Sequence, residues 1–183
     1  FQNINYNQSS KVYAVHNSKY GEIIWFYPSA ASNENDSYVV YNYRENHWAI
    51  GSLARVSGTD RGVFTNPLMV SVDGYIYEHE VGYAYDGSTP YAESGPYEIG
   101  NGDNIMSVRR VIPDEQSLGE VVVSFKTRMY PMATETTYGP YSATQPTDVR
   151  FAARQVKVRY TGAVTDDWRI GTNRFDVVAM GKR

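Results

Sequence analysis

Few residues in this 183-residue chain have the types and spacing that catalysis or metal binding requires. Glu78, His79 and Glu80 form the closest approach to a run of metal ligands. Residues i and i+2 of a strand share a face and residue i+1 does not, so only the two glutamates would converge. We therefore expect His79 to be hydrogen-bonded or to face solvent, and we expect no metal and no cofactor.

Two other polar patterns also fall short of a known site. The segment 33–36 (NEND) offers oxygen ligands suited to calcium, but it lacks the Gly and the distal Glu of an EF-hand loop, so we predict a turn. Asp166 and Asp167 precede Trp168 as a turn entering a strand would. The chain has no Cys, and it contains no Gly-x-Ser-x-Gly, P-loop or dinucleotide motif. The sequence predicts a protein that is not an enzyme.

Aromatic side chains are the more informative feature. The chain holds 17 Tyr, more than a small core can enclose with every hydroxyl satisfied. Tyr and Trp are enriched in protein interfaces, and they also form platforms on which sugars stack. An assembly protein and a carbohydrate binder would both show this composition. We single out Tyr43, Trp48 and Tyr77 as candidate interface residues.

The composition predicts an all-β fold. Val occurs 20 times and Leu only three times, and β-branched and aromatic side chains suit strands better than helices. Apolar residues nowhere recur with helical spacing over three turns. Turn-forming residues recur about every ten positions, which is the spacing of short strands.

Residues 1–88 are predicted to form β-propeller-like blades, too few to close a ring. Residues 23–26 and 38–41 are apolar without alternation, so both faces of their sheet should be covered, as in blades that pack radially. Asp73-Gly74 is a hairpin signal. The strands that we expect are 12–15, 22–27, 38–43, 47–51, 68–72 and 75–79.

Residues 89–183 are predicted to form an antiparallel β-sandwich. The strand pattern changes near residues 86–90 (DGSTP), after which apolar and polar residues alternate. Val121, Val123 and Phe125 share one strand face and polar residues share the other, the pattern of a sheet with one dry face. The apolar residues occupy odd positions in 149–153 and even positions in 156–158. One extra residue in the strand would keep both sets facing the core, so we predict a bulge near Arg154. The last expected strand is 174–180.

The charge is nearly balanced overall, with a net of −3, which does not point to nucleic-acid or membrane binding. It is unevenly divided, because residues 1–92 carry 5 basic and 9 acidic groups and residues 93–183 carry 12 and 11. Arg150, Lys157 and Arg159 fall on the predicted polar faces of the sandwich. They are interface candidates, which could meet phosphate or a neighbouring subunit, or they form a solvated face that protects sheet edges.

Several blocks of this chain resemble the C-terminal part of bacteriophage virion proteins at the head-to-tail junction. That family includes the tail hub or nozzle and the packaged-DNA stabilisation proteins of short-tailed phages. The resemblance runs over most of the chain from about Lys11. The blocks are WFYPS at 25–29, SYVVYNYRENHWAIGSLAR at 37–55, DRGVF at 60–64, NP at 66–67, DGYIYEHE at 73–80, ESGPYEIG at 93–100, and WRIGT at 168–172 through VVA at 177–179.

The resemblance implies a structural role and no catalytic residues. Such proteins form a ring beneath the portal and help to make the conduit or seal through which DNA leaves. For this chain it implies a ring homo-oligomer, expected to be a hexamer, that contacts portal, adaptor and tail proteins while packaged DNA passes without specific binding. It further implies assembly in the host cytoplasm, localisation to the virion and no membrane partner. The chain opens at Phe1 without Met, so we expect a piece of a longer protein.

The alternative function is carbohydrate binding, in a tail receptor-binding protein or a secreted glycosidase. Trp25, Trp48 or Trp168 would then supply a stacking platform. The pattern Trp-x-Ile-Gly occurs at 48–51 and again at 168–171. In each copy Trp and Ile share a strand face and Gly ends the strand, so we expect core packing instead.

Overall fold

The computed structural model describes residues 2–85, 89–99 and 102–182. It is 48% strand and 3% helix, which confirms the all-β prediction. The chain divides into two compact units, residues 1–88 and 89–183, and none of the sheets is closed. Three residues of the predicted boundary between the two units, 86–88, lie outside the described part of the chain.

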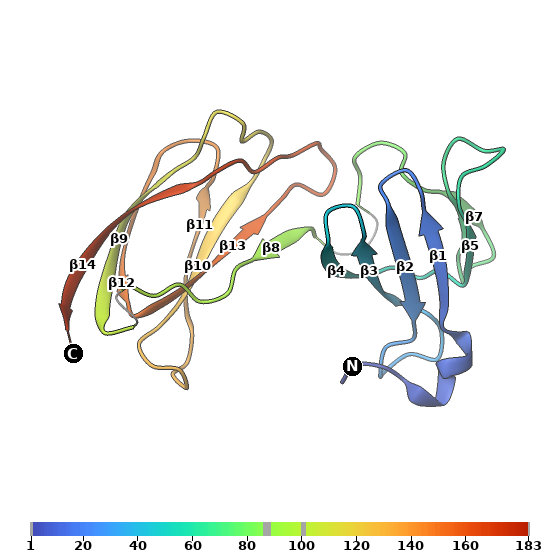
Figure 1. Ribbon diagram of the computed structural model, residues 1–183, viewed down its shortest axis with the longest axis horizontal. Coiled ribbons are helices and arrows are strands. Elements are labelled where there is room, and N and C mark those ends of the chain that lie inside the picture. Colours follow the sequence, from blue (N-terminus) through green and yellow to red (C-terminus); the bar gives the residue numbers. More distant parts are fainter. Residues whose placement is uncertain (1, 86–88, 100–101, 183) are drawn as a thin grey trace. The chain divides into compact units, whose positions relative to one another are not determined.

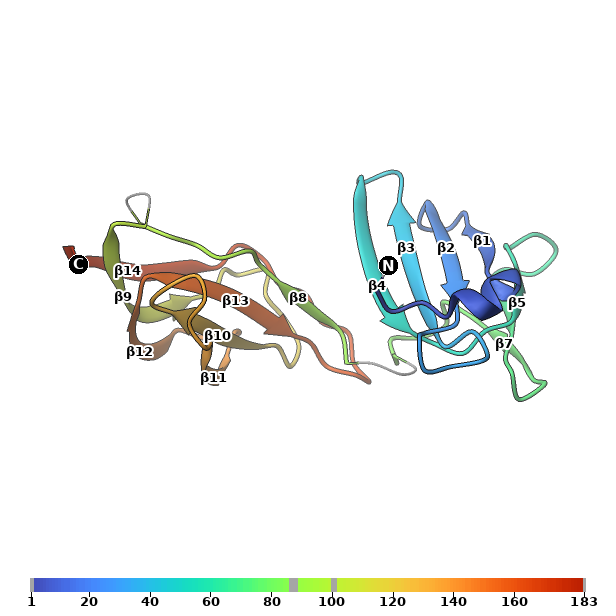
Figure 2. The ribbon, with the colours of Figure 1, turned by 90° about the horizontal axis from the view of Figure 1, so that it is seen from below.

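The N-terminal unit begins with a short 3-10 helix, Tyr6–Lys11, and continues as a four-stranded antiparallel meander. Its strands lie in the order of the sequence, as in a propeller blade (Figures 1 and 2). Asn46 has a φ of 55°, a left-handed conformation that Asn tolerates well, and it closes the turn between the last two strands. The strands are β1 (Tyr13–Asn17), β2 (Glu22–Tyr27), β3 (Ser37–Asn42) and β4 (His47–Ser52).

A second, three-stranded sheet completes this unit, with β5 (Ser57–Thr59), β6 (Leu68–Val70) and β7 (Ile76–Glu78). The predicted hairpin turn lies between β6 and β7. Gly74 has a φ of 86°, and the Asp73 carboxylate accepts a hydrogen bond from the Tyr75 N–H at 3.0 Å. Both strands are shorter than predicted because this turn begins one residue after β6.

The core of the N-terminal unit lies between these two sheets. Phe26 from β2 and Met69 from β6 are buried there, and the Tyr38 ring centroid lies 5.8 Å from that of Phe26. A Cβ on Gly51 would lie 2.4 Å from the Tyr38 ring, so the strand opposite Tyr38 accepts only glycine here. The four-stranded sheet is covered on this face. On its other face Trp48 is 63% exposed, so the prediction that both faces are covered is wrong.

The C-terminal unit is a β-sandwich of two antiparallel sheets. The β10 sheet has the order β11-β10-β13-β8, and the β9 sheet has the order β12-β9-β14. Figure 1 shows the two layers, and Figure 2 shows them from below. The strands are β8 (Tyr91–Glu93), β9 (Asn104–Ile112), β10 (Val122–Arg128), β11 (Thr136–Ser142), β12 (Thr147–Ala153), β13 (Gln155–Thr161) and β14 (Arg174–Lys182).

Aromatic and β-branched side chains from both sheets fill the sandwich. Phe125 is 1% exposed, and its ring centroid lies 4.9 Å from that of Phe151 and 5.7 Å from that of Phe175. Val121 and Val123 are buried beside it, which confirms the predicted dry face.

The bulge predicted near Arg154 is wrong. The chain leaves the β9 sheet after Ala153 and enters the β10 sheet at Gln155, so Arg154 lies at the crossing between the two layers. The inward-facing parity changes there because β12 and β13 face the same core from opposite sides.

Candidate functional site

One face of the β1–β4 sheet carries apolar side chains from three neighbouring strands. The register places Trp25, Val39 and Ile50 in one row across the sheet, and residues opposite each other share a face. The next row of this face repeats the arrangement. We call the surface the open face, and it comprises Ile23, Trp25, Val39, Tyr41, Trp48 and Ile50.

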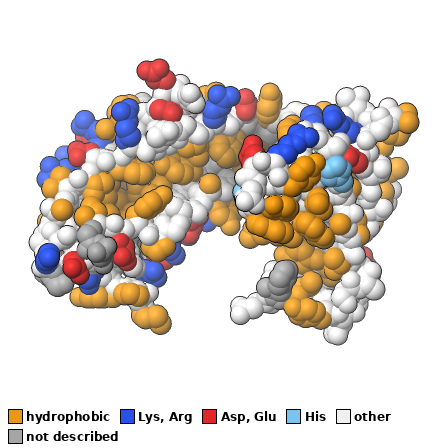
Figure 3. Space-filling view, in the orientation of Figure 1, with side chains coloured by type: hydrophobic (Ala, Val, Ile, Leu, Met, Phe, Trp, Pro, Cys, Tyr) orange, Lys and Arg blue, Asp and Glu red, His pale blue; other side chains and the backbone are white. Residues whose placement is uncertain are grey.

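The aromatic rings of the open face stack on one another and stay accessible. The Trp48 ring centroid lies 4.6 Å from that of Tyr41 and 5.9 Å from that of Trp25. Trp48 is 63% exposed and Ile50 is 70% exposed, and both belong to β4, the edge strand of the four-stranded sheet. Figure 3 shows hydrophobic side chains gathered over these strands. A contiguous apolar patch of this kind marks an interaction surface.

A polar rim borders the open face along strand β1. The His16 Nε2 atom lies 3.1 Å from the Tyr43 hydroxyl, and its Nδ1 atom lies 2.9 Å from an Asp60 carboxylate oxygen. Burial works to raise the pKa of Asp60, but hydrogen bonds from Ser18 and Arg61 lower it below its usual value. These contacts hold the Tyr43 ring in place beside the apolar rows. The structure therefore brings the predicted candidates Trp48 and Tyr43 to one surface.

The third aromatic candidate, Tyr77, lies in the smaller sheet. Its hydroxyl donates a hydrogen bond of 2.8 Å to the Asp73 carboxylate, and the Arg55 guanidinium lies 4.5 Å from its ring centroid. Both contacts belong to the β6–β7 hairpin and its neighbouring loop. Tyr77 thus stabilises local structure and does not join the open face.

The three cationic candidates do not form one patch. Arg150 is on the outer face of the β9 sheet, whereas Lys157 and Arg159 are on the outer face of the β10 sheet, across the core. Lys157 forms an ion pair with Glu135 at 2.6 Å, and Arg159 forms one with Glu93 at 3.2 Å. The sequence could not reveal these partners, because Glu93 and Glu135 lie far from them along the chain.

Two further arginines, which the sequence interpretation missed, lie near Arg150. Arg109 and Arg110 are both exposed on β9, although neighbours on a strand normally face opposite ways. The register of β9 shifts here against both neighbouring strands. The sequence does indicate this irregularity in β9. The buried apolar residues fall on even positions at Met106 and Val108 and on an odd position at Val111, so one residue is inserted between them.

The polar residues that the sequence offered as metal ligands form hydrogen bonds with other side chains and with the backbone. His79 accepts a hydrogen bond of 2.9 Å from the Arg55 Nε–H, as expected for a satisfied histidine. The 33–36 segment lies in a loop, and Asp36 closes that loop by accepting hydrogen bonds from the backbone N–H and the hydroxyl of Ser29. Among residues 2–85, 89–99 and 102–182, no three His, Asp or Glu side chains are placed to hold a metal ion.

Two carboxylates meet at a buried amide beneath the β1–β4 sheet. The Asn17 side chain is fully buried, and its N–H groups donate to Glu80 at 3.1 Å and to Glu22 at 3.3 Å. Burial, and secondly the charge of Glu22, raise the pKa of Glu80 above its usual value. Here the structure holds two acidic groups against the same partner.

The two copies of Trp-x-Ile-Gly have different environments. Trp168 packs against the sandwich core, and a Cβ on Gly162 would lie 2.2 Å from its ring. Core packing is therefore confirmed for Trp168. It is wrong for Trp48, which belongs to the open face.

Comparison with known proteins does not identify the chain. No family model matches it, and no curated protein matches it either. No helix in the described residues is long and apolar enough to cross a membrane.

Proposed function

We propose that this chain is a structural protein of a phage virion, at the head-to-tail junction or in the tail tube. It would form part of a ring-shaped conduit or seal for packaged DNA and its ejection. The observation that carries the proposal is the open face. The longest block of the phage resemblance, residues 37–55, covers strands β3 and β4, which supply four of its six side chains.

The chemistry of the open face favours a protein partner. Ile23, Val39 and Ile50 present only hydrocarbon, and on each strand the aliphatic residue is followed or preceded on this face by an aromatic one. Interfaces that persist are built in this way, with an apolar centre and a polar rim. The paired His16 and Asp60 side chains supply polar groups at one border.

A ring of identical subunits needs two different contact surfaces on each subunit. The open face would be one of them, and the neighbouring copy would supply the other. The chain's near-neutral charge suits a channel that lets DNA pass without holding its phosphates. The portal, the adaptor and other tail proteins would be further partners in the virion.

The test is the solution mass of the full chain by light scattering, with negative-stain images. The variant Trp48→Ser with Ile50→Ser removes the two most exposed members of the open face and no buried contact. Val63→Ser with Phe64→Ser is the matched control, because these residues are 100% and 60% exposed in a loop outside the open face.

A ring in the wild-type and control proteins, lost in the Trp48 and Ile50 variant, supports assembly through the open face. A wild-type chain that stays monomeric at high concentration contradicts self-assembly. A ring that survives both substitutions places the interface elsewhere on the chain.

The second candidate is a carbohydrate-binding domain, which the exposed Trp48 ring, stacked beside the half-buried rings of Tyr41 and Trp25, favours. A sugar ring stacks on such a platform, but it also requires hydrogen bonds to its hydroxyl groups. The aliphatic half of the open face cannot supply them. A glycan screen read by tryptophan emission separates the two candidates, because Trp48 emission shifts only if sugar covers the ring.

A further inference from the structure

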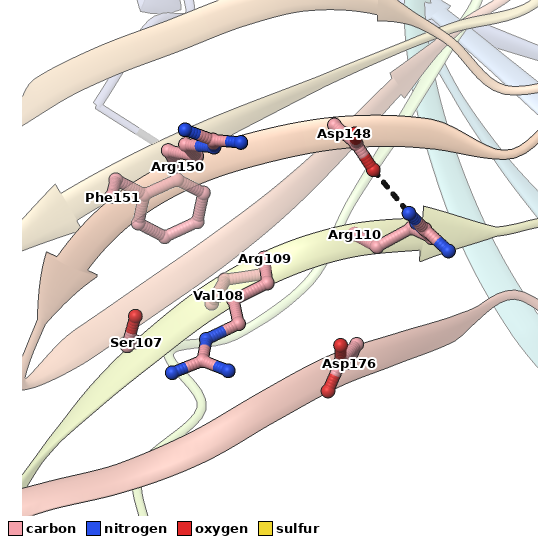
Figure 4. Close-up of a pocket in the computed structure, with 8 residues that line it drawn as sticks. All are labelled: Ser107, Val108, Arg109, Arg110, Asp148, Arg150, Phe151 and Asp176. Atoms are coloured by element: carbon pink, nitrogen blue, oxygen red, sulfur yellow. Dashed lines mark hydrogen bonds and ion pairs between the residues drawn. The ribbon is translucent and has the colours of Figure 1, made fainter.

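The outer face of the β9 sheet gathers three guanidinium groups. The register shift in β9 turns Arg109 and Arg110 to the same side, and β12 places Arg150 next to them. Bulges commonly re-aim a side chain in this way near a functional site. Figure 4 shows the three arginines with Asp148 and Asp176 around one depression.

Within the described part of the chain, Arg110 alone of the three arginines forms an ion pair. The Arg110 Nε–H donates to the Asp148 carboxylate at 2.7 Å, and this contact lowers the pKa of Asp148. Arg109 and Arg150 have no hydrogen bond or ion pair with any residue that the structure describes. They line an open depression of about 630 Å³.

The opposite side of the sandwich provides an internal comparison. On the β10 sheet Lys126 and Arg159 share Glu93, at 2.7 and 3.2 Å, and Lys157 pairs with Glu135. Lys126, Lys157 and Arg159 thus already have carboxylate partners within the chain. Arg109 and Arg150 form no ion pair within the described residues, and Arg150 acts on Asp148 only through its charge, so this depression has unused capacity for an oxyanion.

We propose that the Arg109–Arg150 depression binds a carboxylate group from the N-terminal unit of a second copy of this chain. Guanidinium groups recognise planar oxyanions through paired N–H donors. This inference rests on the proposed self-assembly, to which it adds the chemistry of the second contact surface.

The charges around the depression favour an isolated carboxylate over nucleic acid. The depression is lined by three arginines and by Asp148 and Asp176, so its formal net charge is one positive unit. Duplex DNA presents one negative charge per ~1.7 Å of its axis, so it would bring neighbouring phosphates against these aspartates. A single carboxylate needs no more than one free guanidinium group, and Arg109 and Arg150 each present one.

The charge division of the chain identifies the source. Residues 1–92 carry 9 acidic and 5 basic groups, whereas the sandwich half carries a small basic excess. Exposed acidic side chains of the N-terminal unit include Glu45, which is 74% exposed and lies 3.6 Å from His47, and Glu34, which is 53% exposed and pairs with Lys11. A contact between unlike halves of neighbouring copies gives the head-to-tail geometry that closes a ring.

The first test reads the site without assembly. Arginine Nε–Hε resonances are recorded for the full-length Trp48→Ser, Ile50→Ser variant while sodium acetate is added, with sodium chloride as the ionic-strength control. Arg109 and Arg150 are expected to shift with acetate, and Arg159 is not. Arginine signals that respond equally to both salts would overturn the site.

The second test reads the partner. Self-association of the full chain is measured by sedimentation for Arg109→Gln with Arg150→Gln, and for Lys157→Gln with Arg159→Gln, which removes the same charge. The first pair is expected to weaken association by about tenfold and to flatten its salt dependence. Equal weakening by both pairs would overturn the proposal, because it would show only a general charge effect.

Anisotropy with labelled duplex DNA completes the design. DNA binding that is lost only with Arg109→Gln and Arg150→Gln would assign the site to phosphate and overturn the carboxylate. The failures of the two proposals are distinct. A monomeric wild-type chain contradicts self-assembly and with it the second copy as the source, while the acetate titration still decides whether the depression binds an oxyanion.

Discussion

Phe125→Ala is expected to destabilise the sandwich strongly and to leave the N-terminal unit intact. Phe125 is 1% exposed at the centre of the sandwich core, and the nearest ring centroids, those of Phe151 and Phe175, lie at 4.9 and 5.7 Å. Truncation of a buried Phe typically costs about 3–5 kcal/mol. Each aromatic pair contributes a further ~0.5–1.5 kcal/mol, so the loss should fall in the upper part of that range.

The matched variant is Phe26→Ala, because Phe26 is also 1% exposed and lies in the core of the other unit. Each sheet is built from strands of one unit only, and each unit has its own core. Urea unfolding is followed by amide NMR signals assigned to each unit. The Phe125 variant should lower the urea midpoint only for the sandwich signals, and the Phe26 variant only for the N-terminal signals.

Common unfolding of both units in either variant would refute this reasoning. It would mean that the two cores are thermodynamically coupled, so that residues 1–88 and 89–183 do not act as separate units. A loss below ~1 kcal/mol for Phe125→Ala would contradict the close packing of the core directly.

Two further predictions concern titrating groups. Because the pKa of Glu80 is raised above the ordinary value of 4.5, its ionisation opposes folding: stability is complete below pH 4.5 and falls as pH rises through the folded pKa. Glu80→Gln should therefore have a higher unfolding free energy than wild type at pH 7 and the same unfolding free energy below pH 4.5. Chemical denaturation at a series of pH values measures both, and a variant that is less stable than wild type at pH 7 would contradict the prediction. Burial raises the pKa of Tyr160 to about 12, so stability present below pH 10 is lost as pH rises through 12. Absorbance titration should show a late-ionising tyrosine component that decreases in Tyr160→Phe, and an unchanged curve would contradict the burial.

Local sequence patterns predicted the strands well where the pattern and the final environment agree. The strand at 22–27 has the predicted bounds, and Asp73-Gly74 forms the predicted turn, because both depend on neighbouring residues. The dry face at Val121, Val123 and Phe125 likewise follows from simple alternation. These features need no knowledge of distant partners.

The failures arise where distant segments decide the outcome. An apolar strand such as β4 looks the same in sequence whether another sheet covers it or not, so the Trp-x-Ile-Gly pattern predicts core packing for Trp48 while the aromatic composition marks it as an interface candidate. The parity change at Arg154 has two structural causes, a bulge or a change of sheet, and only the partner strands distinguish them. The ion pairs of Lys157 and Arg159 likewise depend on loops and strands that fold onto them from elsewhere.

The strand order of the two units implies an order of events during synthesis. In the β1–β4 meander every strand pairs with its sequence neighbour, so each hairpin can form as soon as it leaves the ribosome. In the β9 sheet, β9 is the middle strand and can pair only after β12 and then β14 have been synthesised, and β14 follows every other described strand in the sequence. Closing such long loops is slow, so the nascent sandwich holds its apolar side chains unprotected after the meander has formed. Chaperones that act during translation would be needed for the second half of this chain rather than the first.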